Sequence, residues 1–161
     1  MGVTRIAYAA GGWGVGELWA SDGLVVEIDH PRPARSASSI PDRALRDLSG
    51  LAARLSDWFA GSRDDFRDVE LDLEWCTPFQ RALLEALRHV PYAETVTYGE
   101  LAALAGRPGA ARAAGTFCAR NRFAVVVPCH RVVGAAGLGG YGSLGLVYKQ
   151  GLLELEARGA L

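Results

Sequence analysis

The stretch Val125-Val126-Val127-Pro128-Cys129-His130-Arg131-Val132-Val133 decides how the rest of the sequence is interpreted. Its apolar start predicts a buried strand, which should stop at Pro128 because proline cannot donate the next ladder hydrogen bond. A thiol and an imidazole follow, where a rigid support can hold a reacting atom in position. The thiolate is the nucleophilic form, and His130 and Arg131 would both favour it. The competing interpretation is a buried structural cysteine, because free cysteine is often part of a core.

Composition and cysteine content narrow the class of protein. The chain has 161 residues, of which 50% are hydrophobic and 22% charged, as expected for one globular domain or two small ones. No apolar run approaches a membrane span and there is no secretory signal, so we expect no membrane association. Cys76, Cys118 and Cys129 lack CxxC spacing and cannot all pair. They predict a reducing, cytoplasmic location without a zinc finger, and we expect neither metal nor cofactor.

The charge is small overall but unevenly distributed. A net charge of −1 argues against a chain that binds nucleic acid through its total charge. However, residues 100–131 contain Arg107, Arg112, Arg120, Arg122 and Arg131, and Glu100 is the only acidic residue among them. Arginine suits bidentate contacts with phosphate.

Residues 1–73 predict a small N-terminal α+β domain. Strands are expected at Thr4 to Ala10, Gly14 to Ala20 and Leu24 to Asp29, with a hairpin signal at Asp22-Gly23. Apolar residues at helical spacing predict a helix from Pro41 to Ala60, and Val69 to Leu73 alternates like a half-buried strand. This domain contains no residue pattern that indicates chemistry.

Residues 74–161 predict a mostly helical C-terminal domain. One helix follows Thr77-Pro78, and another begins at Tyr98 with Thr97 and Glu100 in a capping box. Ala110 to Ala119 is a second helix of small residues, so the pair forms a helix-turn-helix candidate. A final helix from Val147 to Arg158 places Glu156 on the face of its apolar residues, where His130 can pair with it.

These motifs occur together in an order and spacing that match a known family. They are Thr77-Pro78-Phe79-Gln80, Thr97-Tyr98-Gly99-Glu100-Leu101-Ala102, Ala110-Ala111-Arg112-Ala113, Asn121, Pro128-Cys129-His130-Arg131-Val132 and Leu152-Leu153-Glu154-Leu155-Glu156. Over about residues 75 to 158 the chain resembles the O6-alkylguanine-DNA alkyltransferases (methylated-DNA–protein-cysteine methyltransferases). The N-terminal part is compatible with the ribonuclease-H-like domain of that family, although it carries no diagnostic motif.

The resemblance implies DNA repair by direct reversal. An alkylated guanine would flip out of the duplex, and Cys129 would take its O6-alkyl group irreversibly, once per molecule. Glu156 would orient His130, which would draw the proton from Cys129 through water. Tyr98 would donate a hydrogen bond to the leaving base, and Asn121 would support the turn that carries Cys129.

The resemblance also implies how DNA is bound. The partner would be double-stranded DNA containing O6-alkylguanine, contacted by a monomer through the minor groove and largely independently of sequence. Arg112 would fill the gap left by the flipped base. The other candidate DNA contacts are Thr97, Tyr98, Ala111, Gly115, Arg120, Arg122 and Arg131. The candidate substrate-pocket residues are Pro128, Val132, Tyr141, Gly142 and Ser143.

Two departures from the family pattern leave details open. In the segment Gly139 to Gly145, Tyr141 comes one step early and an extra residue precedes the final helix; Arg122 stands where proline commonly follows the asparagine. That loop lines the alkyl pocket in the family, so the preferred alkyl size and activity on O4-alkylthymine stay undecided.

Two other functions are compatible with parts of the pattern. A non-enzymatic lesion sensor would use the same helices, but relatives of that kind replace the cysteine. A Cys-His-Glu hydrolase of small molecules would not need Arg112 on an alanine-rich helix, and it should turn over repeatedly.

Overall fold

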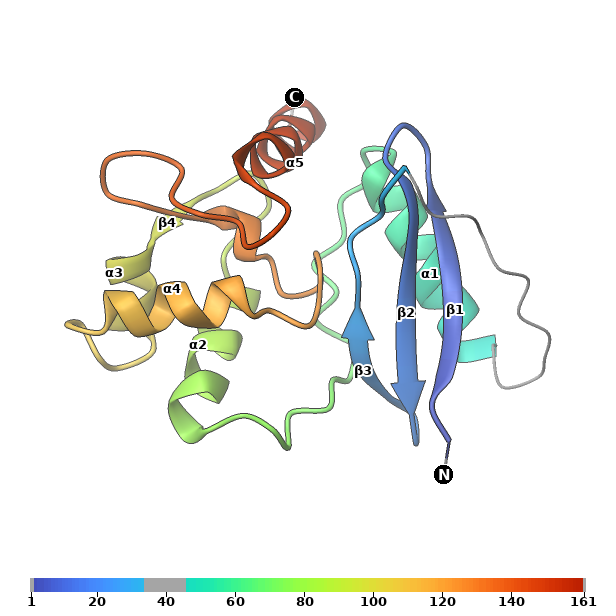
Figure 1. The fold of residues 1–161 in the computed structure, drawn as a ribbon, viewed down its shortest axis with the longest axis horizontal. Coiled ribbons are helices and arrows are strands. Elements are labelled where there is room, and N and C mark those ends of the chain that lie inside the picture. The colour runs from blue at the N-terminus through green and yellow to red at the C-terminus, as the bar shows by residue number, and fades with distance from the viewer. Residues whose placement is uncertain (1, 34–45, 161) are drawn as a thin grey trace. The chain divides into compact units, whose positions relative to one another are not determined.

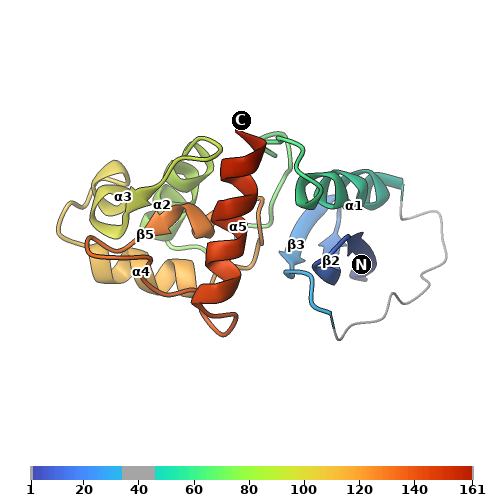
Figure 2. The ribbon, with the colours of Figure 1, turned by 90° about the horizontal axis from the view of Figure 1, so that it is seen from above.

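The structure, a computed structural model, describes residues 2–33 and 46–160 as a mixed α+β fold (Figures 1 and 2). Its contacts divide the chain into two units. Unit 1 comprises Met1–Asp72 and Arg122–Ala124, and unit 2 comprises Leu73–Asn121 and Val125–Leu161. The predicted boundary between residues 73 and 74 lies next to the first break between the units. The return of residues 122–124 to unit 1 was not predicted.

Unit 1 is a three-stranded antiparallel sheet with one helix against it. Strand β2 (Gly14–Ser21) pairs with β1 (Thr4–Ala10) on one side and with β3 (Leu24–Ile28) on the other. Figures 1 and 2 both show α1 (Arg46–Phe59) along one face of this sheet. Asp22 and Gly23 have φ angles of 53° and 80°, as a type I′ hairpin turn requires. The predicted strands, turn and helix are confirmed; residues 41–45 of the predicted helix lie outside the described residues.

The core of unit 1 lies between the sheet and α1. Leu18 of β2 and Leu55 and Trp58 of α1 have no exposed surface. The predicted strand at Val69 to Leu73 is wrong, because only Leu71 bridges Val25. The N–H of Val25 donates to the carbonyl of Glu70, and the carbonyl of Val25 accepts from the N–H of Asp72. The segment therefore touches the sheet edge at a single residue.

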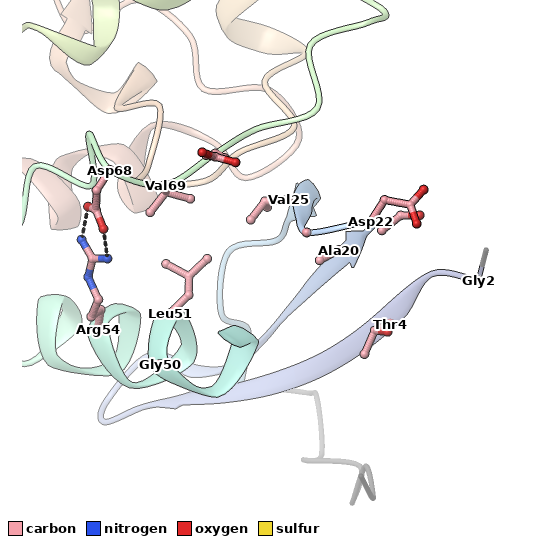
Figure 3. A pocket seen from close by; sticks show the side chains of 13 residues that line it. Gly2, Thr4, Ala20, Asp22, Val25, Gly50, Leu51, Arg54, Asp68 and Val69 are labelled. Carbon is pink, nitrogen blue, oxygen red and sulfur yellow. Dashed lines mark hydrogen bonds and ion pairs between the residues drawn. The ribbon is translucent and has the colours of Figure 1, made fainter. Parts of the chain in front are cut away.

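Unit 1 also contains a cavity of about 640 Å³, which Figure 3 shows from close by. Arg54 of α1 is the arginine in its lining, and Asp68 and Asp64 both bind its guanidinium, with Nε–Oδ2 of Asp64 at 2.7 Å. Hydrogen bonds to these two carboxylates raise the pKa of Arg54. The guanidinium is thus neutralised by the protein itself, and none of the predicted site residues lines this cavity.

Unit 2 is built from four helices and a two-stranded parallel sheet. The helices are α2 (Pro78–Arg88), α3 (Tyr98–Leu104), α4 (Ala111–Ala119) and α5 (Leu146–Gly159). Thr77 and Thr97 cap α2 and α3, and Gln80 and Glu100 complete the two capping boxes. Each box satisfies two helix N–H groups that would otherwise lack partners. The predicted starts of these helices are confirmed.

The small parallel sheet brings the start of α3 next to Cys129. Strand β4 (Val96–Thr97) immediately precedes α3, and β5 (Val132–Val133) immediately follows the 3₁₀ helix η2 (Cys129–Arg131). Val96 pairs with Val132 and Thr97 with Val133. Tyr98 and Cys129 are therefore held near one another although 31 positions separate them in the sequence.

The predicted strand that ends at Pro128 is wrong. Val125, Val126 and Val127 are buried, but they form turns, and Val125 has a φ of 68°. Pro128, with φ −81° and ψ 67°, is the centre of an inverse γ-turn closed by the Cys129 N–H on the Val127 carbonyl at 2.8 Å. A short apolar run indicates burial without fixing a period. Here the buried chain turns sharply instead of extending.

None of the helices within residues 2–33 and 46–160 combines the length and apolar composition that a membrane span needs.

Candidate active site

Cys129 opens onto a second cavity, which lies within unit 2 and has a volume of about 260 Å³. Its side chain is 4% exposed. The cavity is bounded by α3, the end of α4, the Cys129 turn and the loop of residues 134–145, through Tyr98, Gly115, Cys118, Ala119, Cys129, Gly140, Tyr141 and Gly142. Small side chains and glycines make up most of this wall, which leaves room for a planar group beside the sulfur.

His130 and Glu156 form a buried pair behind Cys129. The distance from His130 Nε2 to Glu156 Oε2 is 3.0 Å, and neither side chain has exposed surface. The predicted pairing of these residues is confirmed. Burial lowers the pKa of His130, although Glu156 opposes this. A neutral imidazole that donates Nε2–H to the carboxylate has Nδ1 as its acceptor atom, so His130 is prepared to take up a proton.

Arg131 holds the same carboxylate from another direction. Its Nε lies 3.0 Å from each oxygen of Glu156, and its terminal nitrogen donates to the carbonyl of Val90 at 2.8 Å. The N–H of Ala93 also donates to Glu156 at 3.3 Å. Burial acts to raise the pKa of Glu156, but the hydrogen bonds from His130 and Arg131 outweigh it and lower that pKa to about 2. Glu156 is therefore ionised.

The prediction that Arg131 contacts DNA is wrong. The residue is 5% exposed and its guanidinium is occupied by Glu156 and Val90. It is a positioning residue for the His130–Glu156 pair. The sequence did contain a signal for this role. Glu156 was expected to point inward, and both His130 and Arg131 could pair with it, but the prediction paired it with His130 alone.

Asn121 connects the end of α4 to the turn that carries Cys129. Its Nδ2 donates to the carbonyl of Val127 at 2.8 Å, and its side chain also hydrogen-bonds to Cys129. The carbonyl of Val127 thus accepts from both Asn121 and the Cys129 N–H. This double contact fixes the position of the γ-turn relative to the sulfur.

Lys149 is a buried residue of the site for which the sequence pattern indicated no role. It has no exposed surface, and its ammonium donates to the carbonyls of Val132 and Leu138 and, at 3.1 Å, to that of Gly140. Burial lowers the pKa of Lys149, whereas the two nearby cysteines raise it. The residue attaches the 134–145 loop to β5 and supplies positive charge near the sulfur. The carbonyl partners come from an irregular loop, which sequence patterns do not place.

Tyr98 lines the cavity beneath the 134–145 loop. Its hydroxyl donates to the carbonyl of Gly140 at 3.4 Å, and burial raises its pKa, so it stays a protonated donor. Gly139 has a φ of 76°, and a Cβ there would lie 2.7 Å from the tyrosine ring. Only glycine allows the loop to pass this close to Tyr98.

The Cys129 thiol is protonated in the resting site. Burial raises the pKa of Cys129, and a hydrogen bond with Cys118 adds to the increase, while Lys149 and Asn121 oppose it. A buried thiol of this kind needs a base to become a nucleophile. His130, with its lowered pKa, is the adjacent group suited to that role.

The predicted pocket residues divide into two groups. Tyr141 and Gly142 line the cavity, whereas Pro128, Val132 and Ser143 do not. Pro128 forms the γ-turn and Val132 pairs with β4, so their positions are set by backbone structure. Cys118, Ala119 and Gly140 also line the cavity but were not among the predicted pocket residues.

Exposed small residues and Arg112 lie on α4, and Arg120 follows at its C-cap. Ala111, Arg112 and Arg120 are exposed, while Gly115 faces the cavity and Thr97 uses its hydroxyl as the cap of α3. Figures 1 and 2 both show α3 and α4 side by side. Arg122 is also exposed, and it belongs to unit 1, where its charge acts on Glu27.

Comparisons with known proteins identify the family of this chain. Residues 78–158 match the family model described as 6-O-methylguanine DNA methyltransferase, DNA binding domain. The chain is 51% identical over 114 residues to a methylated-DNA–protein-cysteine methyltransferase of Mycolicibacterium paratuberculosis, covering 70% of this chain and 67% of that protein. A protein of the same name from Methanosarcina acetivorans is 50% identical over 104 residues, covering 64% of this chain and 65% of that protein. The matched part thus spans about two thirds of these relatives.

Solved structures extend the similarity to nearly the whole chain. The crystal structure of the Mycobacterium tuberculosis O6-methylguanine methyltransferase has a TM-score of 0.77 and 36% identity, covering 99% of this chain and 96% of that one. The Mycobacterium tuberculosis protein in complex with DNA has a TM-score of 0.77 and 36% identity, covering 96% of this chain and 93% of that one. The chain therefore belongs to the family of methylated-DNA–protein-cysteine methyltransferases, DNA-repair enzymes that transfer an alkyl group from DNA to one of their own cysteines.

Proposed function

We propose that this chain repairs DNA by taking the O6-alkyl group of guanine onto Cys129, once per molecule and irreversibly. The observation that carries the proposal is the position of the Cys129 thiol on a cavity wall, with the buried His130–Glu156 pair behind it. The side chains around the cavity supply an acceptor for the thiol proton and a donor for the leaving base.

The reaction is a displacement at the alkyl carbon. The Cys129 proton passes to His130 Nδ1, through water because adjacent residues of a chain point apart. A sulfur electron pair then forms the S–C bond while the bond from carbon to guanine O6 breaks. Glu156 stabilises the imidazolium that results. The anion that develops on guanine accepts a hydrogen bond from Tyr98.

The size and walls of the cavity favour one extruded base. Its volume of about 260 Å³ is near the lower end of ligand pockets. Tyr141 forms part of the wall and stacks on Tyr148, with ring centroids 6.3 Å apart. A flipped guanine with a small O6-alkyl group is a ligand of suitable size.

We further propose that α3 and α4 act as a helix-turn-helix that enters the minor groove of the duplex. Small exposed residues on α4 would allow close approach, and Arg112 would fill the gap left by the flipped base. Arg120 and Arg122 would contact phosphates, giving binding that is largely independent of sequence. A monomeric state, a ribonuclease-H-like N-terminal domain and a cytoplasmic location remain predictions from the sequence.

The deciding experiment is intact-protein mass spectrometry after mixing with a duplex that contains O6-methylguanine. We expect one added methyl group, saturating at one equivalent, and peptide mapping should locate it on Cys129. Cys129→Ser should bind the duplex without gaining mass, and Cys76→Ser should behave like the parent. Binding without transfer by the parent would favour a lesion sensor. Repeated turnover on small esters or amides would favour a hydrolase.

A further inference from the structure

Two thiols share the cavity of unit 2. Cys129 lies in η2 and Cys118 in the last turn of α4, and both side chains line the cavity. The two thiols hydrogen-bond to one another, and neither is in a disulfide. Cys76 does not line this cavity. The proposed mechanism uses only one of the two sulfurs, so Cys118 is a nucleophilic group without an assigned role.

Cys118 and Cys129 face the same small cavity, and Cys118 acts on the thiol of Cys129 through a side-chain hydrogen bond. A disulfide requires an S–S distance of about 2.05 Å and Cβ atoms about 3.5–4.5 Å apart. Sulfurs in hydrogen-bond contact must therefore still move towards one another before an S–S bond can form. Cys118 is the second-last residue of α4, two positions before the C-cap at Arg120. Helix ends fray easily, so the last turn of α4 can supply the movement that brings the sulfurs together.

We propose that Cys118 is a resolving cysteine for Cys129: a peroxide converts the pair into a Cys118–Cys129 disulfide, which blocks alkyl transfer until a thiol reduces it. The disulfide itself does not depend on the proposed function, but its consequence for transfer does. This assigns a redox modification site to the cavity.

The chemistry balances with peroxide as the oxidant. The thiolate of whichever cysteine the peroxide meets first attacks one peroxide oxygen and becomes a sulfenic acid. The O–O bond breaks at the same time, and the other oxygen leaves as hydroxide. The second sulfur then attacks the sulfenic sulfur; an S–S bond forms, the S–O bond breaks, and hydroxide leaves to become water on protonation. In total two thiols and one hydrogen peroxide give one disulfide and two water molecules.

The arrangement protects a residue that the protein can use only once. A sulfenic acid without a nearby thiol is oxidised further to sulfinic acid, which thiols do not reverse. Cys129 would then be lost before it met a lesion. With Cys118 in contact, oxidation stops at the disulfide, which thiol exchange returns to the active dithiol.

The test starts from the full-length parent protein treated with hydrogen peroxide. Intact mass should fall by two hydrogens, and peptide mapping should find Cys118 linked to Cys129. Methyl acceptance from O6-methylguanine duplex should disappear and return after treatment with dithiothreitol. A product with only added oxygen, or a link that involves Cys76, would overturn the proposal. If the reduced parent accepts no methyl group, the proposed function fails, while the disulfide is still decided by the mass.

Two variants isolate the resolving role. Each is compared with its own reduced activity, because Cys118 lines the cavity. In Cys118→Ala, peroxide should add oxygen to Cys129, and dithiothreitol should restore several-fold less of the transfer than in the parent. Cys76→Ser is the matched control and should form the disulfide and recover like the parent. Full recovery of Cys118→Ala would show that Cys118 does not resolve the oxidised sulfur.

Discussion

At the scale of single residues, Glu156 determines the charge state of the groups behind Cys129. Its one buried carboxylate accepts hydrogen bonds from His130, from Arg131 and from the backbone of Ala93. An ionised carboxylate in a buried position is stable only with such partners. Arg131 balances its charge, so that His130 can stay neutral and act as the proton acceptor.

Replacing Arg131 tests this division of roles. Arg131→Met should lower the free energy of unfolding by about 3–5 kcal/mol, because it leaves a buried carboxylate without its cationic partner. Thermal unfolding measures the loss. Arg112→Met is the matched control: the side chain is exposed, so stability should change by less than about 0.5 kcal/mol. Transfer from duplex DNA should nevertheless fall in this control. An Arg131→Met protein as stable as its parent would refute the positioning role.

The hydroxyl of Tyr98 gives a second prediction at this scale. Tyr98→Phe should slow single-turnover methyl transfer by roughly 10²-fold, the usual cost of losing one donor to a developing anion. Unfolding should hardly change, because the hydroxyl makes only a 3.4 Å bond to Gly140. Tyr148→Phe removes a hydroxyl from a residue that does not line the cavity and should transfer at the parental rate. Equal rates for both variants would exclude Tyr98 as the donor.

At the scale of elements, the cavity depends on how the 134–145 loop is held over α3. Lys149 fixes the loop by donating hydrogen bonds to the carbonyls of Leu138 and Gly140. Gly139 lets the same segment pass against the ring of Tyr98. The loop is therefore a wall with a defined position, and changes in its backbone should alter transfer without touching the sulfur.

A pair of glycine substitutions tests the wall. Gly139→Ala introduces a side chain at a φ of 76°, with its Cβ 2.7 Å from the ring of Tyr98. We expect a loss of about 1–3 kcal/mol and slower transfer, because either the ring or the loop must shift. Gly137→Ala lies in the same loop, where a Cβ would meet nothing within 4 Å, and should have little effect. Equal behaviour of the two variants in thermal unfolding and transfer assays would contradict this account.

Signals that act over a few residues predicted the correct elements. The Asp22-Gly23 turn and the capping boxes at Thr77 and Thr97 satisfy backbone groups locally, so the sequence alone identifies them. The Glu156–His130 pair was predictable because helical spacing puts Glu156 on the buried face of α5. These features need no knowledge of the path of the chain elsewhere.

Features that depend on the path of the chain were not predictable. Burial of Val125 to Val127 was correct, but their turns are stabilised by Asn121 and by the N–H of Cys129. The sequence alone made Arg131 look like a surface charge, because its partners come from Val90, just after α2, and from Glu156 of α5. Cys118 lines the cavity because of where the last turn of α4 lies. Lys149 belongs to the site because the 134–145 loop supplies carbonyls that bind it. In each case the missing information was a contact between distant segments.

At the scale of the whole molecule, the buried charges of unit 2 make stability depend on pH. Burial lowers the pKa of His130, so below its ordinary value of 6.5 the unfolded chain binds a proton that the folded chain does not. For Glu156, whose pKa is about 2 in the folded protein, the same difference holds from about pH 4.5 downwards. In both ranges the unfolded state binds more protons, so the free energy of unfolding falls as the pH falls.

We therefore expect the urea midpoint, followed by circular dichroism, to be highest at about pH 7–8. It should decline between about pH 6.5 and 5 as the unfolded chain protonates His130, and decline further below pH 4.5. The fall in the pKa of Glu156 from 4.5 to about 2 corresponds to about 3 kcal/mol, lost progressively towards pH 2. Glu156→Gln should remove the lower range and leave a protein that is less stable at neutral pH, because Arg131 then lacks its carboxylate. A parent midpoint that is constant from about pH 7 to pH 3 would contradict a buried, ionised Glu156.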